Sequence, residues 1–181
     1  DLIAHVEGTY RVQAGPGGRA LLGISMGGYA ALRIGLAQPG LFKVVATHSA
    51  MLFEAIPSGE GLGQWRNAAG HKVFGDPVDP ALWASSDPLA WADKVDPKSA
   101  PALYFDCGSE DRLGVFAGNT ELDRRLTARK IPHEFALYPG NHGYEYVRSV
   151  LEKSLRFIAR NLNPESGTPK TGSAPKKGGQ E

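Results

Sequence analysis

Residues 21–33 read LLGISMGGYAALR, a stretch in which one serine separates an apolar run from an amphipathic one. The apolar run 19–25 is typical of a short strand that is buried on both faces of a parallel sheet. The segment 26–40 has apolar residues at helical spacing and stops at a Pro-Gly pair, as a helix does. The sequence therefore predicts that Ser25 lies on a turn between a buried strand and a helix.

The same alternation of strand and helix runs through the rest of the chain. Apolar runs predict further strands at 42–50, 101–108 and 133–140. Apolar residues at helical spacing predict further helices at 1–10, 114–129 and 143–161. In the last helix, the residues predicted to face inward are Val147, Val150, Leu151, Leu155 and Ile158. This alternation predicts an α/β fold with a mainly parallel sheet and helices on both faces.

Two segments stand apart from this pattern and set the domain organisation. Residues 51–100 carry many Pro and Gly residues and little periodicity, so we expect an irregular insert that shapes a binding region. Residues 163–181 hold no large apolar residue, so we expect a disordered tail after one domain over 1–162. Because the chain opens on Asp1 and not on Met, we expect a piece of a longer chain, whose compartment the sequence leaves open.

The composition excludes several classes of function. Of the 181 residues 41% are apolar, and 20 basic residues balance 19 acidic ones to a net charge of +1. That balance argues against nucleic acid or an anionic membrane surface as a partner, and no apolar run reaches the roughly 18–20 residues of a membrane span. Cys107 is the one cysteine, so no intrachain disulfide forms. The sequence has neither a His-x-x-x-His pattern nor paired acidic ligands, so we predict no metal site and no cofactor.

Polar side chains follow the carboxyl ends of the predicted strands, where open parallel sheets gather their reactive groups. In chain order they are Ser25, His48, Ser49, Asp106, Glu110, Asp111, Asn141 and His142. A hydroxyl, a carboxylate and an imidazole therefore reach one edge of the sheet in the order Ser, Asp, His.

The segment GISMG has the pattern G-x-S-x-G, which favours Ser25 as a nucleophile over a serine in an ordinary Gly-rich turn. A hydroxyl needs a base to attack near neutral pH, and His142 is the candidate. Asp111 is the candidate for the carboxylate that orients the imidazole. The N–H of Met26, at the start of the helix, is placed to donate to an oxyanion.

Alternatives stay open for several of these residues. His142 can be an ordinary loop histidine, and His48 can line the pocket or be a packed polar residue. Asp106 can hold its loop by an Asx-turn, and Glu110 is expected to face water. Cys107 is a weak rival nucleophile, because a thiol in a buried run behaves as a small hydrophobe.

The insert carries three tryptophans, which are candidates for the lining of a substrate pocket. They are Trp65, Trp83 and Trp91. Their rings suit stacking on a sugar or an aromatic acyl group, and the alternative is that they pack the insert onto the core.

At these residues the sequence resembles the putative-esterase branch of the α/β-hydrolases, which includes S-formylglutathione hydrolases (esterase D), feruloyl, acetylxylan and enterochelin esterases, and mycolyltransferases. The matching pieces are GISMGGYAAL at 23–32, DCGSEDRL at 106–113, PGNHGYEY at 139–146 and, in the insert, FGDPVDPALWASSDPLAWADK at 74–94. The resemblance implies that Ser25 is the nucleophile, Asp111 the orienting acid and His142 the general base, with Met26 supplying an oxyanion N–H.

The resemblance also implies an activity, that of a serine carboxylic-ester hydrolase working through an acyl-enzyme on a small ester or thioester. Two alternatives are an acyltransferase of the mycolyltransferase type and a non-catalytic hydrolase-fold binding module. The sequence departs from the family because the family's sheet has several more strands before the serine, and its second oxyanion donor follows an early strand. We therefore expect the strand at 19–25 to expose an apolar edge, and residues 1–181 alone to be poorly soluble or inactive.

Overall fold

The computed structural model describes residues 2–56 and 70–162, and within them four parallel strands form one sheet in the order β1-β2-β3-β4. The strands are β1 (Ala20–Ile24), β2 (Val44–His48), β3 (Ala102–Gly108) and β4 (His133–Tyr138). The predicted strands are confirmed, each shorter than its apolar run. Because all neighbours are parallel, the four carboxyl ends meet at one edge of the sheet.

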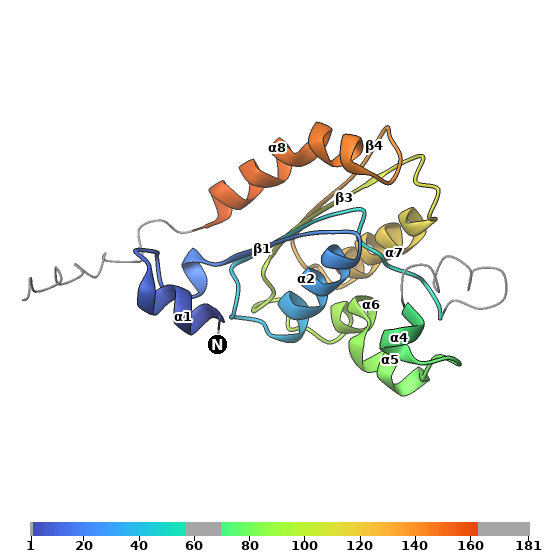
Figure 1. The fold of residues 1–181 in the computed structure, drawn as a ribbon, viewed down its shortest axis with the longest axis horizontal. Helices are drawn as coiled ribbons and strands as arrows, with labels where there is room; N and C mark the ends of the chain where they lie inside the picture. The colour runs from blue at the N-terminus through green and yellow to red at the C-terminus, as the bar shows by residue number, and fades with distance from the viewer. Residues whose placement is uncertain (1, 57–69, 163–181) are drawn as a thin grey trace, which may run out of the picture.

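Helices cover both faces of the sheet, so the predicted α/β architecture is confirmed (Figure 1). On one face lie α2 (Met26–Ala37), α6 (Pro88–Ala92) and α7 (Val115–Ala128), and on the other lies α8 (Tyr144–Asn161). The larger core lies between the sheet and the first group, and it includes Leu32, Leu36, Leu89, Leu103, Phe105, Leu122 and Leu126. A smaller core joins α8 to the opposite face through Val44, Ala46, Tyr104 and Phe157.

Of the residues predicted to face inward on α8, Val147 and Val150 are buried, Leu151 and Ile158 are half-buried, and Leu155 is exposed. The buried side chains of α8 are Tyr146, Val147, Val150, Ser154 and Phe157. The prediction that Leu155 faces inward is wrong, because this side chain is 50% exposed. From Val147 on, the buried residues follow one another by three or four positions and share a face, whereas residue 155 is rotated by about 100° from residue 154. A serine therefore takes the inward position that the hydrophobic pattern assigns to a leucine.

β1 lies at the edge of the sheet, with β2 as its single strand neighbour within the described residues. The prediction that this strand is buried on both faces is wrong, because Leu22 is 42% exposed and Ile24 is 43% exposed. Both side chains point to the α8 side of the sheet, and α8 packs mainly over β2 and β3. The expected exposed apolar edge at this strand is confirmed.

The insert is more regular than its sequence suggests. It contains α4 (Gly70–Phe74), α5 (Pro80–Ser86) and α6, so the irregular structure predicted for this part of 51–100 is wrong. Asp79 caps α5 by accepting from the N–H groups of Ala81 and Leu82, and Asp87 caps α6 by accepting from the N–H of Leu89. Helices this short show little periodicity, but an Asp-Pro pair at each start is a readable helix signal.

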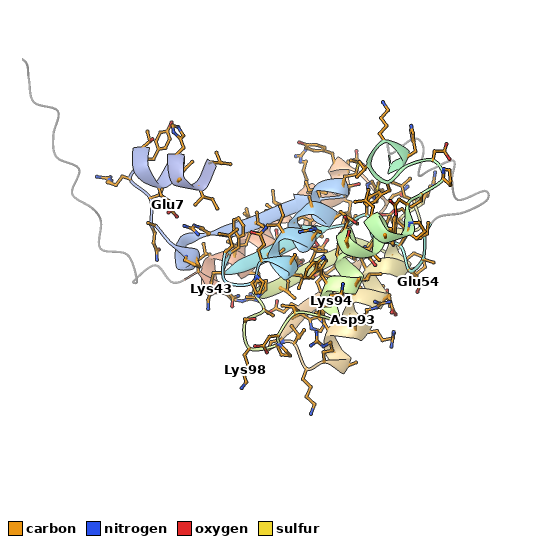
Figure 2. All side chains as sticks on the ribbon, turned by 90° about the horizontal axis from the view of Figure 1, so that it is seen from below. Glu7, Lys43, Glu54, Asp93, Lys94 and Lys98 are labelled. Carbon is orange, nitrogen blue, oxygen red and sulfur yellow. The ribbon has the colours of Figure 1, made fainter. Side chains whose placement is uncertain are left out.

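The amino-terminal helix α1 (Leu2–Thr9) confirms the predicted helix at 1–10, but it has no buried side chain. It stands apart from the sheet in Figure 2. Its Glu7 accepts from the N–H of Gly15 over 3.0 Å and pairs with Arg19 over 2.7 Å, beside the short 3-10 turn η1 (Pro16–Gly18). No helix in the described part of the chain is long and apolar enough to cross a membrane. The predicted tail at 163–181 lies outside the described residues.

Candidate active site

Ser25 lies between β1 and α2 in a backbone conformation that residues with a side chain rarely adopt, with φ 55° and ψ −117°. Hydrogen bonds on both sides hold this conformation. The N–H of Ser25 donates to the carbonyl of His48 over 3.0 Å, and the N–H of Met51 donates to the carbonyl of Ser25 over 3.0 Å. The start and end of the loop after β2 therefore fix the turn that carries the predicted nucleophile.

Two glycines let β1, α2 and the loop after β2 approach one another around this turn. A Cβ at Gly23 would lie 2.2 Å from the carbonyl oxygen of Gly27, and a Cβ at Gly28 would lie 2.9 Å from the Cβ of Ala50. Gly27 itself has no heavy atom within 4 Å of the place where its Cβ would stand. The G-x-S-x-G pattern therefore has a packing reason at its first glycine, and the second tight position is Gly28 rather than Gly27.

His142 follows β4 and brings its imidazole to Ser25, with 2.9 Å between Nε2 and the Ser25 Oγ. The two residues are separated by 117 positions along the chain, so the contact depends on the register of the whole sheet. The imidazole is 20% exposed, which leaves the site open to small molecules. In this geometry the Ser25 hydroxyl donates to Nε2 when the imidazole is neutral.

Asp111 lies behind the imidazole, with 2.8 Å between its Oδ2 and Nδ1 of His142. Its side chain has no exposed surface, and its Oδ1 accepts from the N–H of Leu113 over 2.9 Å. Burial acts to raise the pKa of Asp111, but the hydrogen bonds from His142 and from the N–H of Leu113 outweigh burial and hold the pKa below its usual value. The ionised carboxylate therefore keeps the His142 proton on Nδ1 and leaves Nε2 free to accept from Ser25.

Asn141 connects the loop of the acid to the loop of the base. Its Oδ1 accepts from the N–H of Arg112 over 3.0 Å and from the N–H of His142 over 2.7 Å. The sequence places Asn141 at the sheet edge but gives it no role. The signal for this role in the sequence is its position directly before His142, where a side-chain amide can bridge neighbouring loops.

His48 and Asp106 lie together beneath the site and not in it. His48 Nδ1 donates to the two carboxylate oxygens of Asp106 over 3.0 and 2.9 Å, and neither side chain has exposed surface. His48 Nε2 lies 2.9 Å from the hydroxyl of Ser154, on the inward face of α8. We call His48, Asp106 and Ser154 the buried set. The packed alternative for His48 therefore matches its position, and an Asx-turn does not describe Asp106.

The remaining alternatives at this edge have separate positions. Glu110 is exposed, as expected. Cys107 is fully buried, and its Sγ lies 3.8 Å from the Oδ2 of Asp111. Burial raises the pKa of the Cys107 thiol to about 12, so the group stays protonated near neutral pH. A buried, protonated thiol is a poor nucleophile, and Cys107 is better described as a neighbour of the acid.

The described tryptophans make packing contacts. Trp83 is 6% exposed, and its ring centroid lies 5.2 Å from that of Phe74. The indole N–H of Trp91 donates to the carbonyl of Ser85 over 2.8 Å, and the ring packs against the larger core. These contacts match the packing alternative, and a substrate contact for either ring stays a prediction. Trp65 lies outside the described residues.

The arrangement can activate a hydroxyl and can stabilise negative charge beside it. Met26 begins α2, so its N–H has no intrahelical partner and belongs to the electropositive end of that helix. Within residues 2–56 and 70–162, no group of three or more His, Cys, Asp or Glu side chains is arranged to hold a metal ion. The described edge thus brings together a serine hydroxyl, an imidazole, a carboxylate and the N–H groups at the start of α2.

Comparison with known proteins gives the chain its family. The chain is 31% identical over 183 aligned positions to Esterase Rv1288 of Mycobacterium tuberculosis, an alignment that covers 91% of this chain and 39% of that protein. Among solved structures, a ferulic acid esterase has a TM-score of 0.71 at 24% identity, over 90% of this chain and 58% of its own. An S-formylglutathione hydrolase from Agrobacterium tumefaciens has a TM-score of 0.70 at 20% identity, over 90% of this chain and 55% of its own.

The two structural similarities establish an α/β-hydrolase fold, and the chain spans well under two thirds of the length of the proteins it matches. The model of one protein family, described as "Putative esterase", matches residues 1–158. This match covers most of the 181 residues, so the chain belongs to the putative-esterase family.

Proposed function

We propose that this chain carries the active site of a serine carboxylic-ester hydrolase in which Ser25 is the nucleophile, His142 the general base and Asp111 the orienting acid. The observation that carries the proposal is the continuous series of hydrogen bonds from Asp111 through His142 to Ser25, over 2.8 and 2.9 Å. The series ends on a strained serine at the carboxyl edge of the sheet, beside a helix N-terminus. Membership of the putative-esterase family supports the same reaction class.

The first half of the reaction acylates the serine. The Ser25 Oγ forms a bond to the carbonyl carbon of the ester while its proton passes to Nε2 of His142. Asp111 stabilises the imidazolium that results, because its ionised carboxylate faces Nδ1. When the tetrahedral intermediate collapses, the bond to the alcohol or thiol breaks, and the leaving group takes the proton from His142.

The second half of the reaction removes the acyl group. Water gives a proton to Nε2 of His142 and attacks the acyl carbon, and collapse of the second intermediate breaks the bond to Ser25. The proton returns from His142 to the serine oxygen, so the enzyme is regenerated and the acid is released. The N–H of Met26 donates to the oxyanion in both halves.

We further propose that residues 1–181 alone turn over esters poorly. Met26 supplies one oxyanion donor, and the loss of one donor from such a site costs roughly 10²–10³ in rate. The exposed Leu22 and Ile24 on β1 also favour self-association of the isolated chain. Rapid, sustained hydrolysis of p-nitrophenyl acetate by residues 1–181 would contradict this part of the proposal and leave the assignment of the catalytic residues intact.

A fluorophosphonate probe tests the nucleophile directly. Attack of the Ser25 oxygen on phosphorus expels fluoride and leaves a stable adduct, and the serine proton passes to His142. We expect the intact mass to rise by one adduct and peptide mapping to place that adduct on Ser25. Because the adduct accumulates irreversibly, a slow site still reacts to completion, which suits a chain with impaired turnover.

Matched serine variants complete the test. Ser25→Ala removes the adduct, whereas Ser154→Ala, in which the serine of the buried set is changed, keeps it. Circular dichroism shows whether each variant is folded. A folded chain that does not react, or an adduct that persists in Ser25→Ala, would contradict the proposed function and would favour a binding module.

A further inference from the structure

The carboxylate of Asp106 accepts hydrogen bonds from three side chains on three elements of the fold. His48 donates from β2, Tyr104 donates its hydroxyl from β3 over 2.8 Å, and Tyr146 donates its hydroxyl from α8 over 2.7 Å. Asp106 has no exposed surface, and both tyrosines are at most 5% exposed. Burying a carboxylate costs free energy unless its oxygens accept hydrogen bonds, so loss of any of these donors destabilises the fold.

The backbone of His48 contacts the turn of Ser25, and the backbone of Asp106 contacts the residue after His48. The carbonyl of His48 accepts from the N–H of Ser25 over 3.0 Å, and the carbonyl of Asp106 accepts from the N–H of Ser49 over 2.7 Å. The turn of Ser25 is therefore bonded to the end of β2, and the start of the loop after β2 is bonded to β3. The side chains of the same two residues contact α8, His48 through Ser154 and Asp106 through Tyr146.

Tyr146 connects Asp106 to the loop that carries His142. It lies in the first turn of α8, four residues after His142, and its ring packs on the backbone of Gly140, two residues before His142. A Cβ at Gly140 would lie 2.8 Å from Cδ2 of that ring. The Gly140 carbonyl in turn accepts from the N–H of Glu110, in the loop of the acid. One aromatic ring therefore holds the chain on both sides of the imidazole.

We propose that Asp106 and Tyr146 are positioning residues that hold the His142 imidazole between Ser25 and Asp111. The hydrogen bond from Tyr146 is directional, so it sets the rotation of the first turn of α8, which apolar packing alone leaves less defined. Neither residue touches the reacting atoms. The proposal rests on the proposed function for its consequence in catalysis, but the geometry of His142 that it predicts is measurable without catalysis.

Two tyrosine variants provide a matched test. Tyr146→Phe removes one hydrogen bond to Asp106 and keeps the ring that packs on Gly140. Tyr104→Phe removes the other tyrosine hydrogen bond to the same carboxylate, from a strand that does not lead into the His142 loop. Both variants lose one buried donor to one carboxylate, so we expect similar losses in the free energy of unfolding. They differ in whether the lost bond to Asp106 comes from α8, the helix that follows His142.

The direct readout is exchange with water of the Nδ1 proton of His142 in the full chain with ¹⁵N-labelled histidine. The resonance is assigned by its absence in His142→Gln. We expect Tyr146→Phe to speed this exchange by about tenfold, as loss of a hydrogen bond to a charged group permits, and Tyr104→Phe to change it by less than about twofold. Equal exchange in the two variants, or no change in Tyr146→Phe, overturns the proposal.

Fluorophosphonate labelling gives the catalytic readout. We expect the second-order rate constant of labelling to fall about tenfold in Tyr146→Phe and to change by less than about twofold in Tyr104→Phe. If the unsubstituted chain is not labelled at all, the proposed function fails, and the exchange measurement alone decides the positioning role. If it is labelled and the two variants are labelled equally fast, the positioning role fails while the proposed function stands.

Discussion

Two sets of serine, histidine and aspartate side chains are joined by hydrogen bonds within residues 2–56 and 70–162, and their surroundings differ sharply. Ser25, His142 and Asp111 lie at the carboxyl edge of the sheet, where the imidazole is 20% exposed. The buried set lies between β2, β3 and α8, and its imidazole and carboxylate have no exposed surface. The distances between histidine and serine are the same, 2.9 Å, so distance alone does not distinguish the two sets.

The difference lies in the serine. Ser154 is an interior residue of α8, and its hydroxyl donates to the carbonyl of Leu151 over 2.9 Å, so its proton is already engaged. Ser25 stands on a strained turn, and within the described residues its hydroxyl has His142 as its one hydrogen-bond partner. We infer that a serine hydroxyl needs access, a proton shared with the base alone and a nearby oxyanion donor to act as a nucleophile, and that hydrogen bonds among the three residue types do not suffice.

Replacing each of the two histidines by glutamine is expected to give the largest difference between the two sets. His142→Gln removes the proposed base, and we expect the rate of fluorophosphonate labelling to fall by about 10²–10⁴, with a smaller loss of stability than in His48→Gln because a glutamine amide can still donate to Asp111. His48→Gln removes a donor from a buried carboxylate, and we expect the free energy of unfolding to fall by about 3 kcal/mol while the folded fraction is still labelled. Labelling kinetics and urea denaturation on both variants separate the two effects, and the reverse pattern contradicts our assignment.

Alanine substitutions at Gly23 and Gly27 test how tightly the turn of Ser25 is packed. A Cβ at Gly23 would lie 2.2 Å from the Gly27 carbonyl oxygen, so we expect Gly23→Ala to lower the free energy of unfolding by about 3 kcal/mol and to slow labelling. Gly27→Ala has open space and gains up to about 1 kcal/mol of helix propensity, so it serves as the matched control. Equal denaturation midpoints for the two variants would show that the turn is not tightly packed.

The proposed catalytic residues are predictable from the sequence because parallel strands share one carboxyl edge. Once the apolar runs are recognised as parallel strands of one sheet, the polar residues that follow them are expected at the same edge, however far apart they are in the chain. The positions of Ser25 and His142 follow in this way. The choice of Asp111 over Asp106 rests on loop length, since the acid must extend beyond the strand to reach the base.

The buried set was not predictable, because it depends on register and on helix rotation. His48 lies opposite Asp106 in the β2–β3 pairing, and a slip of one residue would turn one of them to the other face of the sheet. Ser154 faces them because the stripe of α8 passes through position 154, whereas the hydrophobic pattern points to Leu155. These contacts join residues that are 58 and 106 positions apart, so they depend on three-dimensional packing that periodicity along the chain does not reveal.

The pH dependence of stability distinguishes Asp111, the acid at the carboxyl edge of the sheet, from a simple surface carboxylate. The pKa of Asp111 is lowered in the folded state, although burial opposes this, because His142 and the Leu113 N–H donate to the carboxylate. Its contribution to stability is therefore present above the usual pKa of about 3.9 and is lost as the pH falls through the lowered value.

Asp111→Asn measures this contribution. We expect it to reduce the free energy of unfolding at pH 6 by less than about 2 kcal/mol, and the difference from the unsubstituted chain to shrink by pH ~2. Glu110→Gln, one residue away and exposed, controls for the loss of one negative charge. A difference that stays constant or grows as the pH falls would contradict the lowered pKa.

The smallest expected effect concerns Cys107, which lies between the two sets. Its Sγ is 3.8 Å from the Oδ2 of Asp111, and a thiol is a weak donor, so Cys107→Ala should change the rate of fluorophosphonate labelling by less than about threefold. Iodoacetamide should modify the unsubstituted folded chain very slowly at pH 8, because burial raises the thiol pKa to about 12. Loss of labelling in a folded Cys107→Ala chain would instead restore the thiol as rival nucleophile. Retention shows that the acid is held by His142 and the Leu113 N–H, without help from sulfur.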